Sequence, residues 1–237
     1  AQVIADLEEV VTANQNWAAR HATEPLPLYL GEFGADNEAD FHTQDRKRWL
    51  SWVRLQAEAH DMSWAHWNMY QNIPSAKGMG PWTQTERDIP SQRRFDADPV
   101  EALIGRYEFE DGSRGGGVIS GSARAGFSGA GYALFPAHAG VEVWARADGI
   151  YIPKDGTYTV QIHYASAQAR SLRLVSRNDS AATVQRLDNV VFPATGGTDS
   201  WRTLAIPIDF EAGEFADLQV VATPDAGVQL DWMRLEQ

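Results

Sequence analysis

The chain contains no cysteine, which excludes disulfide bonds and thiolate metal sites. No apolar run approaches the roughly 20 residues of a membrane span, so we expect no membrane partner. Positive charge is scarce: 20 Lys and Arg stand against 32 Asp and Glu, a formal net charge of −12 at pH 7. Because a phosphate backbone requires a basic surface, this balance argues against nucleic acid. The chain has no internal repeat and no low-complexity tract.

The most informative feature that is present is Gly31-Glu32-Phe33-Gly34, which directly follows the apolar run 26–30. A short apolar run bounded by prolines and a glycine predicts a buried strand. In barrels of parallel strands the active site lies at the C-terminal strand ends, and a glutamate is costly to bury without a role. Glu32 is therefore a catalytic candidate, and the alternative is a structural glutamate paired with an arginine.

A further strand and helix pattern follows this strand. Residues 50–60 are helix-like, and Arg46 and Trp49 are expected to lie on a helix. Residues 63–69 form a second strand-like run, Ser-Trp-Ala-His-Trp-Asn-Met. Together with Leu-Tyr-Leu-Gly-Glu-Phe-Gly at 28–34, these features resemble the last quarter of a glycoside hydrolase family 5 barrel. The stretch Lys-Gly-Met-Gly-Pro-Trp, which ends at Trp82, is similar to the loop after the final strand in the bacterial cellulases of that family.

The resemblance covers residues 1–104 and implies part of a (β/α)8 TIM barrel with a retaining mechanism that needs no metal. It assigns Glu32 as the nucleophile and Trp67 as the floor of the neighbouring sugar subsite, with Trp82 as a rim contact. Trp67 has a plain core position as its alternative. The family's acid/base would lie upstream of Ala1, so we expect no turnover from this chain alone.

Length limits what the first domain can be. A complete barrel of this type takes about 250 residues, and the chain has 237 in all. It opens on a helical pattern rather than on a methionine or a signal peptide. We therefore expect the chain to be the C-terminal piece of a longer protein, with residues 1–104 as a barrel fragment.

The sequence changes character after a short helix-like segment, 96–103, that Gly105 ends. Beyond it apolar and polar residues alternate with a period of two, most clearly over 157–164, and glycine is frequent. Short strands of this kind indicate a two-sheet antiparallel β-sandwich. We therefore predict a second domain over 105–237.

Several segments of this second domain, in order, resemble carbohydrate-binding modules of family 6, with some likeness to family 35. That resemblance implies a jelly-roll sandwich with an aromatic platform for sugar rings and polar groups for hydroxyls. The segments are Tyr107–Glu110, Asp155–Val160, Tyr164–Ser166, Phe192–Gly197 and Leu230–Trp232.

The resemblance also suggests which residues contact sugar. Phe135 falls nearest the place of one platform aromatic, and Gln229 falls where the family often has a hydroxyl-binding asparagine. The second aromatic usually follows the Thr-Gly-Gly turn at once. Here Thr198 and Asp199 stand there and Trp201 comes slightly later, so Trp201 is either the platform or a core residue.

Trp144 is a separate candidate for sugar binding. It alternates with apolar residues on its strand and shares a face with Glu142 and Arg146. A tryptophan among charges on an exposed strand face is a possible stacking platform. If a bulge offsets the register, Trp144 is a core residue instead.

The family resemblance further implies a structural calcium that ties the first and last strands through Glu108, Glu110 and Asp231. Glu108 and Glu110 are two apart, so on a regular strand they share a face. Calcium takes about six to eight oxygen ligands, so backbone carbonyls must supply the rest. The alternative is three solvated acids at sheet edges.

These features together predict the C-terminal portion of a secreted, retaining polysaccharide hydrolase with an appended carbohydrate-binding module. The expected activity is that of an endo-β-1,4-glucanase, and the expected partner is a β-linked plant polysaccharide: cellulose or another β-glucan, or mannan or xylan. The alternatives are a β-mannanase of the same family, a non-catalytic carbohydrate-binding protein as the isolated chain, and a protein-interaction domain. We expect a secreted, bacterial-type monomer, a location that the absence of cysteine fits.

Overall fold

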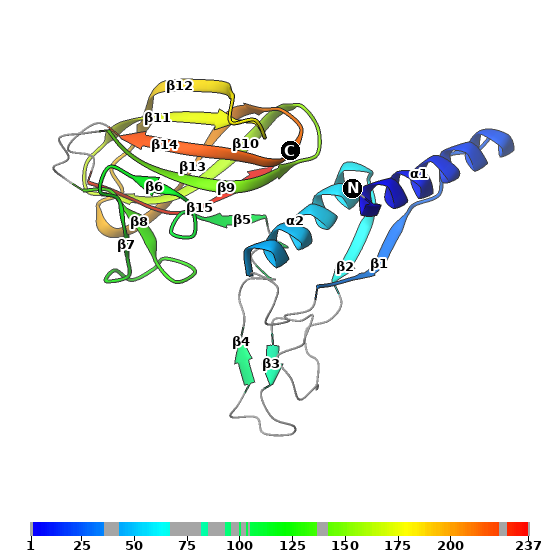
Figure 1. The fold of residues 1–237 in the computed structure, drawn as a ribbon, viewed down its shortest axis with the longest axis horizontal. Helices are drawn as coiled ribbons and strands as arrows, with labels where there is room; N and C mark the ends of the chain where they lie inside the picture. The colour runs from blue at the N-terminus through cyan, green and yellow to red at the C-terminus, as the bar shows by residue number, and fades with distance from the viewer. Residues whose placement is uncertain are drawn as a thin grey trace. The chain divides into compact units, whose positions relative to one another are not determined.

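The computed structural model describes residues 2–35, 43–66, 82–84, 93–95, 100, 103, 105–136, 142–222 and 227–236, and the statements below concern these residues. The chain divides into two compact units, Ala1–Ile104 and Gly105–Gln237 (Figure 1). Each unit is described by itself. None of the helices within the described ranges is long and apolar enough to cross a membrane.

The first unit contains a parallel β-α-β arrangement. Helix α1 spans Gln2–His21, strand β1 Tyr29–Phe33, helix α2 Thr43–Ala59 and strand β2 Ser63–His66. β1 and β2 pair in parallel, and α2 lies between them in the chain as the crossover that a parallel pair needs. The predicted order of strand, helix and strand is confirmed. The first strand begins later than the predicted run 26–30, so that Glu32 lies within it, and Leu26 and Tyr29 are exposed rather than buried. A barrel is not shown by the described part of this unit.

Two small apolar clusters hold the first unit together. Phe33 of β1 packs with Leu50 and Val53 of α2, while Leu7 of α1 packs with Ala57 of α2. The side chain of Asn14 fixes the chain after α1, because it both donates to and accepts from the backbone of Leu26. Apolar side chains stay exposed in this unit, namely Val10, Trp17, Leu26 and Tyr29. A short antiparallel pair follows, β3 Trp82–Gln84 and β4 Arg93–Phe95.

The second unit is a sandwich of two antiparallel sheets, as the sequence predicted. One sheet has the order β13-β10-β15-β8-β7, with β5 also paired to β15, and the other has the order β12-β11-β14-β9-β6. The strands are β5 Arg106–Glu108, β6 Arg114–Gly115, β7 Ile119–Gly121, β8 Tyr132–Leu134, β9 Val143–Ile152, β10 Gly156–Ser166, β11 Arg170–Arg177, β12 Thr183–Phe192, β13 Gly197–Phe210, β14 Gly213–Ala222 and β15 Val228–Glu236.

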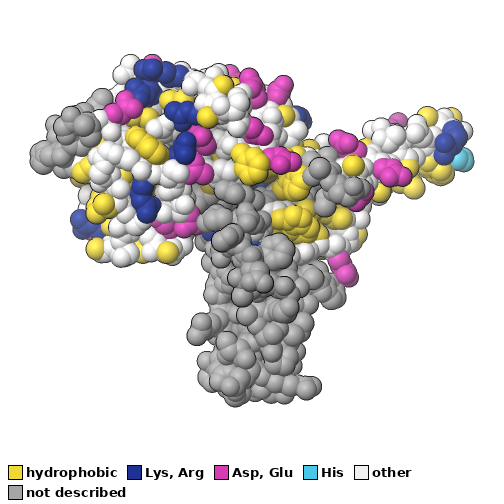
Figure 2. All heavy atoms as spheres, viewed as in Figure 1, with side chains coloured by type: hydrophobic (Ala, Val, Ile, Leu, Met, Phe, Trp, Pro, Cys, Tyr) yellow, Lys and Arg dark blue, Asp and Glu magenta, His cyan; other side chains and the backbone are white. Residues whose placement is uncertain are grey.

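The core of the sandwich lies between these sheets and follows the alternation of the strands. In β10 the side chains of Tyr158, Val160, Ile162 and Tyr164 are buried in one continuous cluster with residues of the facing sheet. On the face of the sandwich seen in Figure 2, charged side chains of both signs are interspersed. Alternation with a period of two is what a half-buried strand requires, since successive side chains point to opposite faces.

The first and last strands of the sandwich lie side by side. β5 pairs with β15, with Glu108 opposite Trp232 and Tyr107 opposite Met233. The backbone N–H of Phe109 continues the ladder by donating to the carbonyl of Asp231. This pairing brings residues more than 100 positions apart in the chain to one place in the sheet.

Candidate functional site

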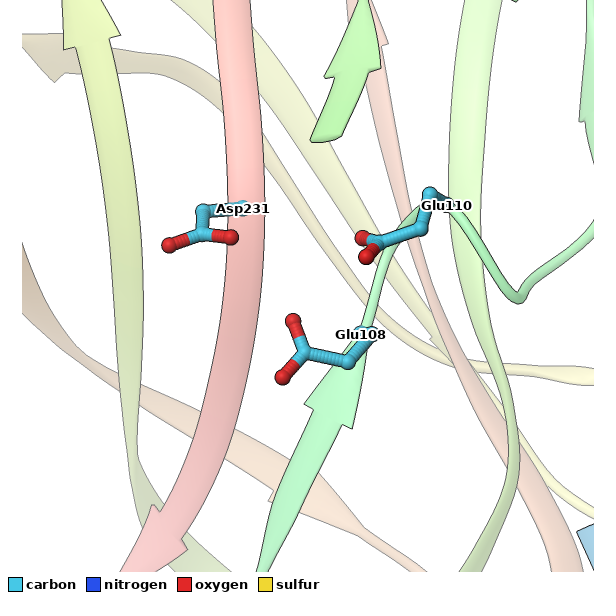
Figure 3. A group of neighbouring side chains, drawn as sticks. All are labelled: Glu108, Glu110 and Asp231. Carbon is cyan, nitrogen blue, oxygen red and sulfur yellow. The ribbon is translucent and has the colours of Figure 1, made fainter. Parts of the chain in front are cut away.

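Three carboxylates meet where the first and last strands of the sandwich pair. Glu108 ends β5, Glu110 lies in the turn after it, and Asp231 lies within β15. One oxygen of each lies within 4.8 Å of the others. The exposed fractions are 5% for Glu108, 9% for Glu110 and 0% for Asp231. The carboxylates of Glu108 and Glu110 point toward β15 (Figure 3), so the sequence-predicted metal residues are brought together in one buried cluster.

The loop between β7 and β8 is fastened onto these carboxylates. The backbone N–H of Ser128 donates to both oxygens of Asp231, at 3.0 and 3.1 Å. Its hydroxyl donates to Glu108, at 3.0 and 3.1 Å from the two oxygens. The N–H groups of Ala130 and Gly131 reach one oxygen of Glu110, at 3.2 and 2.9 Å. The loop thus supplies hydrogen-bond donors to all three buried carboxylates.

Glycine at position 129 of this loop permits a close approach to the carboxylates. Gly129 has a φ of 59°, in the left-handed region. A Cβ atom there would lie 2.7 Å from Oε1 of Glu110 and 3.3 Å from Cδ of Glu108. The loop can approach the carboxylates this closely because position 129 has no side chain.

The cluster carries more negative charge than its protein donors satisfy. Burial raises the pKa of Glu110 to about 8, and the nearby carboxylates of Asp111 and Asp231 raise it further, against backbone hydrogen bonds that lower it. Oε2 of Glu110 is buried and has no hydrogen-bond partner among the described residues. Hard oxygen donors with an unfilled acceptor fit an oxygen-seeking cation such as calcium.

An aromatic column crosses the outer face of the same sheet. The ring of His163 stacks between Trp201, with centroids 5.4 Å apart, and Trp232, with centroids 5.0 Å apart. The guanidinium of Arg106 lies over the ring of Trp232, 4.9 Å from its centroid. Nδ1 of His163 is 2.8 Å from Oδ2 of Asp231. The aromatic column therefore contacts the carboxylate cluster through the hydrogen bond between His163 and Asp231.

Trp201 is packed on the sheet rather than standing free. Besides the stacked His163 ring, Tyr132 packs against Trp201 in a T-shaped arrangement with centroids 5.5 Å apart. The indole N–H of Trp201 donates to the carbonyl of Ala125 at 2.7 Å. Of the two alternatives for Trp201, these contacts favour the packed residue over the sugar platform.

Phe135 and Gln229 are both buried. Phe135 is 1% exposed and belongs to the sandwich core, so its ring offers no face to a sugar, contrary to the expectation for it. Gln229 is 2% exposed and lies opposite Leu134 of β8 and Ala165 of β10. Its Oε1 atom lacks a hydrogen-bond partner within the part of the chain that the structure describes. A buried carbonyl of this kind is costly unless a ligand or water donates to it.

Trp144 lies on the outer face of the other sheet. Its strand neighbours Val143 and Ala145 are buried in the core, so no bulge offsets the register here. The half-buried ring lies against Gly115 of β6, where a Cβ atom would come within 2.6 Å of the ring. The guanidinium of Arg146 lies 5.6 Å from the ring centroid. Of the two alternatives for Trp144, the structure therefore shows the position on a charged outer face and not the core position.

In the first unit Glu32 lies in β1 and is exposed, whereas burial was expected for it. Its neighbour Phe33 is buried and contacts the ring of His66 edge-on, with centroids 5.9 Å apart. Burial lowers the pKa of His66, and the positive charge of Arg46 lowers it further. Trp67 lies outside the described residues, and Trp82 is described only by its place in β3.

Sequence reasoning missed Ser128, Gly129 and His163. The loop that carries Ser128 and Gly129 has no regular pattern, and its partners lie about 20 and 100 residues away in the chain. His163 did leave a signal, because it occupies an outward-facing position of a strand whose apolar residues alternate with it.

No protein-family model matches the chain, and no curated protein is significantly similar to it. Among solved structures, the chain is similar to the isomalto-dextranase of Arthrobacter globiformis T6 complexed with panose, with 21% identity and a TM-score of 0.50. That match covers 56% of this chain and 23% of the other. The chain is also similar to the CBM35 from Paenibacillus barcinonensis (23% identity, 56% and 98% of the two chains, TM-score 0.49) and to a family 35 carbohydrate-binding module from Clostridium thermocellum (20%, 55% and 95%, 0.47). At such identities the first match shows a shared fold, the β-sandwich.

Proposed function

We propose that the second unit is a carbohydrate-binding module. The observation that carries the proposal is Gln229, a buried amide whose Oε1 atom is unpaired among the described residues, at the position where the family 6 resemblance expects a hydroxyl-binding amide. A sugar hydroxyl would satisfy that oxygen. The shared sandwich fold with a protein solved in complex with panose supports the same class of ligand. The expected ligands are β-glucan, xylan and mannan.

Two surfaces are candidates for the sugar site. Each carries one buried amide, and variants of these amides distinguish the two candidates. Gln229 lies in the sheet of β15, whereas Gln219 lies opposite Arg146, next to the strand position of Trp144 on the other sheet. Affinity electrophoresis of the chain through β-glucan, xylan and mannan gels tests them. We expect Gln229→Leu to abolish retardation and Gln219→Leu to preserve it. The reverse order would place the site at Trp144, and wild-type protein that no polysaccharide retards would contradict the proposal.

We also propose that Glu108, Glu110 and Asp231 hold a structural calcium ion. All three are buried, and Oε2 of Glu110 lacks a protein partner within the described ranges, so a cation would fill an existing deficit. When bound, calcium would neutralise the repulsion between three carboxylates and join the first strand of the sandwich to the last. Because all three carboxylates are buried, the cluster fits a structural ion rather than one that contacts sugar.

For the first unit we propose a C-terminal fragment of a family 5 barrel whose parent protein is a retaining endo-β-1,4-glucanase or β-mannanase. The parallel pairing of β1 and β2 supports this, because Glu32 then lies near the C-terminal end of a parallel strand. Retaining hydrolysis needs two carboxyl groups about 5 Å apart. Glu32 would be the nucleophile, and we expect the chain alone to hydrolyse neither cellulose nor mannan. Hydrolysis by this chain that Glu32→Gln abolishes would contradict that expectation.

A further inference from the structure

The geometry around His163 depends on an irregularity in β15. Ile162 of β10 lies opposite Met233, and Tyr164 lies opposite Leu230. Between these two pairs β10 contributes only His163, whereas β15 contributes both Asp231 and Trp232. This is a β-bulge, in which two residues of one strand oppose one of the other.

The bulge explains how two consecutive residues reach the same histidine. On a regular strand adjacent side chains point to opposite faces, but here Asp231 hydrogen-bonds His163 while Trp232 stacks on it. Trp201 covers the other face of the imidazole. The two indole rings therefore fix the plane of the imidazole, which in turn fixes the direction of its Nδ1 atom toward Asp231.

The donor in the hydrogen bond between His163 and Asp231 can be assigned. An ionised aspartate can only accept, so Nδ1 of His163 carries the hydrogen and donates it to Oδ2 of Asp231. Ser128 donates its backbone N–H to the same carboxylate. Asp231 is fully buried, and these two residues leave its carboxylate little freedom to rotate.

We propose that His163 is a positioning residue for the cation site: it holds the carboxylate of Asp231 in one orientation, and the Trp201 and Trp232 rings hold His163. This inference rests on the proposed calcium site. Groups that hydrogen-bond a metal ligand from outside orient it, and their loss typically weakens metal affinity by about 10–100-fold. His163 is not itself a ligand in this account.

Two variants of the full chain separate the roles of the histidine. His163→Phe keeps a flat ring between the tryptophans and removes the donor, while His163→Gln keeps an N–H donor and removes the ring. His21→Phe is the matched control, because His21 also stacks on a tryptophan, Trp17, and hydrogen-bonds through Nδ1, but to a backbone carbonyl in the other unit.

Calcium affinity is measured by competition with a chromophoric chelator, and the packing of the tryptophans by near-UV circular dichroism. We expect His163→Phe to lose about 10–100-fold in calcium affinity with its near-UV spectrum retained. His163→Gln should bind calcium more tightly than His163→Phe with an altered spectrum. His21→Phe should match the wild type in affinity.

Wild-type calcium affinity in His163→Phe would overturn the positioning role alone. A wild-type chain that binds no calcium would overturn the proposed metal site and this inference together, so the two failures are distinguishable. If His163→Phe does not fold, His163→Leu, which also removes the donor, decides: a loss of tenfold or more supports the positioning role, and wild-type affinity overturns it.

Discussion

At the scale of single residues, Glu110 shows most clearly that the carboxylate cluster is electrostatically incomplete. Burial raises the pKa of this carboxyl to about 8, so we expect the folded protein to hold a proton there at neutral pH when no cation is bound. Protonation and cation binding are two ways to relieve the same repulsion between neighbouring carboxylates.

This shift predicts how stability depends on pH when a chelator is present. The folded pKa of about 8 lies above the ordinary value of 4.5, so between these values the folded state binds a proton that the unfolded state has released. Stability should therefore fall as pH rises through this window, by up to about 1.4 kcal/mol per pH unit. Urea unfolding at pH 5, 6.5 and 8 measures it. Glu110→Gln should flatten the profile, and a chelated wild type whose stability rises over this range would contradict the assignment.

Gly129 allows a second test with a built-in control. Gly129→Ala adds a Cβ atom 2.7 Å from Glu110 as well as left-handed strain, whereas Gly196→Ala adds strain at a φ of 101° with no heavy atom nearer than 4.0 Å. We expect Gly129→Ala to cost about 1–3 kcal/mol more than Gly196→Ala, and to weaken calcium binding. Equal losses in urea unfolding would show that the loop does not need this close approach.

At the scale of elements, alternation predicted much of the sandwich, and local irregularities explain what it missed. The inward positions of β10 follow directly from a period of two. In β15 the inward residues Val228, Leu230, Met233 and Leu235 are spaced two, three and two apart, and the interval of three marks the bulge. That interval is visible in the sequence, but its consequence for Asp231 requires the partner strand. The donors of the 122–131 loop could not be predicted, because they depend on tertiary contacts.

One hydroxyl joins β10 to the segment that leads into β13. The buried Thr195 side chain accepts from the N–H of Ser166 at 3.1 Å, and its Oγ1 lies 2.9 Å from the carbonyl of Gly197. Thr195→Val keeps the shape and removes the partner of the buried N–H of Ser166, which should cost about 1–3 kcal/mol. Thr203→Val, at an exposed position of β13, is the control and should stay within about 0.5 kcal/mol of wild type. Equal stabilities in urea would exclude this anchor.

At the scale of the whole molecule, the described residues of the two units differ in the size of their apolar cores. The sandwich has one continuous core between two sheets, whereas the first unit has two small apolar clusters. The resemblance over 28–34 and 63–69 predicted the parallel strand pair. Trp67, which it assigned to the floor of the sugar subsite, lies outside the described residues, so that assignment stays a prediction. An open parallel pair leaves its edges and faces unsatisfied.

Expression of each unit alone tests this difference. We expect residues 105–237 to stay soluble and to melt in one cooperative transition, because the two sheets complete a core by themselves. Residues 1–104 should expose apolar surface, bind a hydrophobic dye and aggregate. Light scattering and calorimetry measure both outcomes. A soluble first unit that melts cooperatively would show that it folds without further structure.

The buried carboxylate cluster is the feature on which the proposed metal and the role of His163 both depend. The direct measurement is a pair of thermal melts of the full chain, one with calcium and one with chelator. At about one hundred times the dissociation constant, calcium should add about 2.7 kcal/mol, or roughly 5–10 °C. Asp231→Asn should abolish the difference, while Asp217→Asn, a buried aspartate of the other sheet, should keep it. Superimposed wild-type melts would contradict a structural cation at Glu108, Glu110 and Asp231.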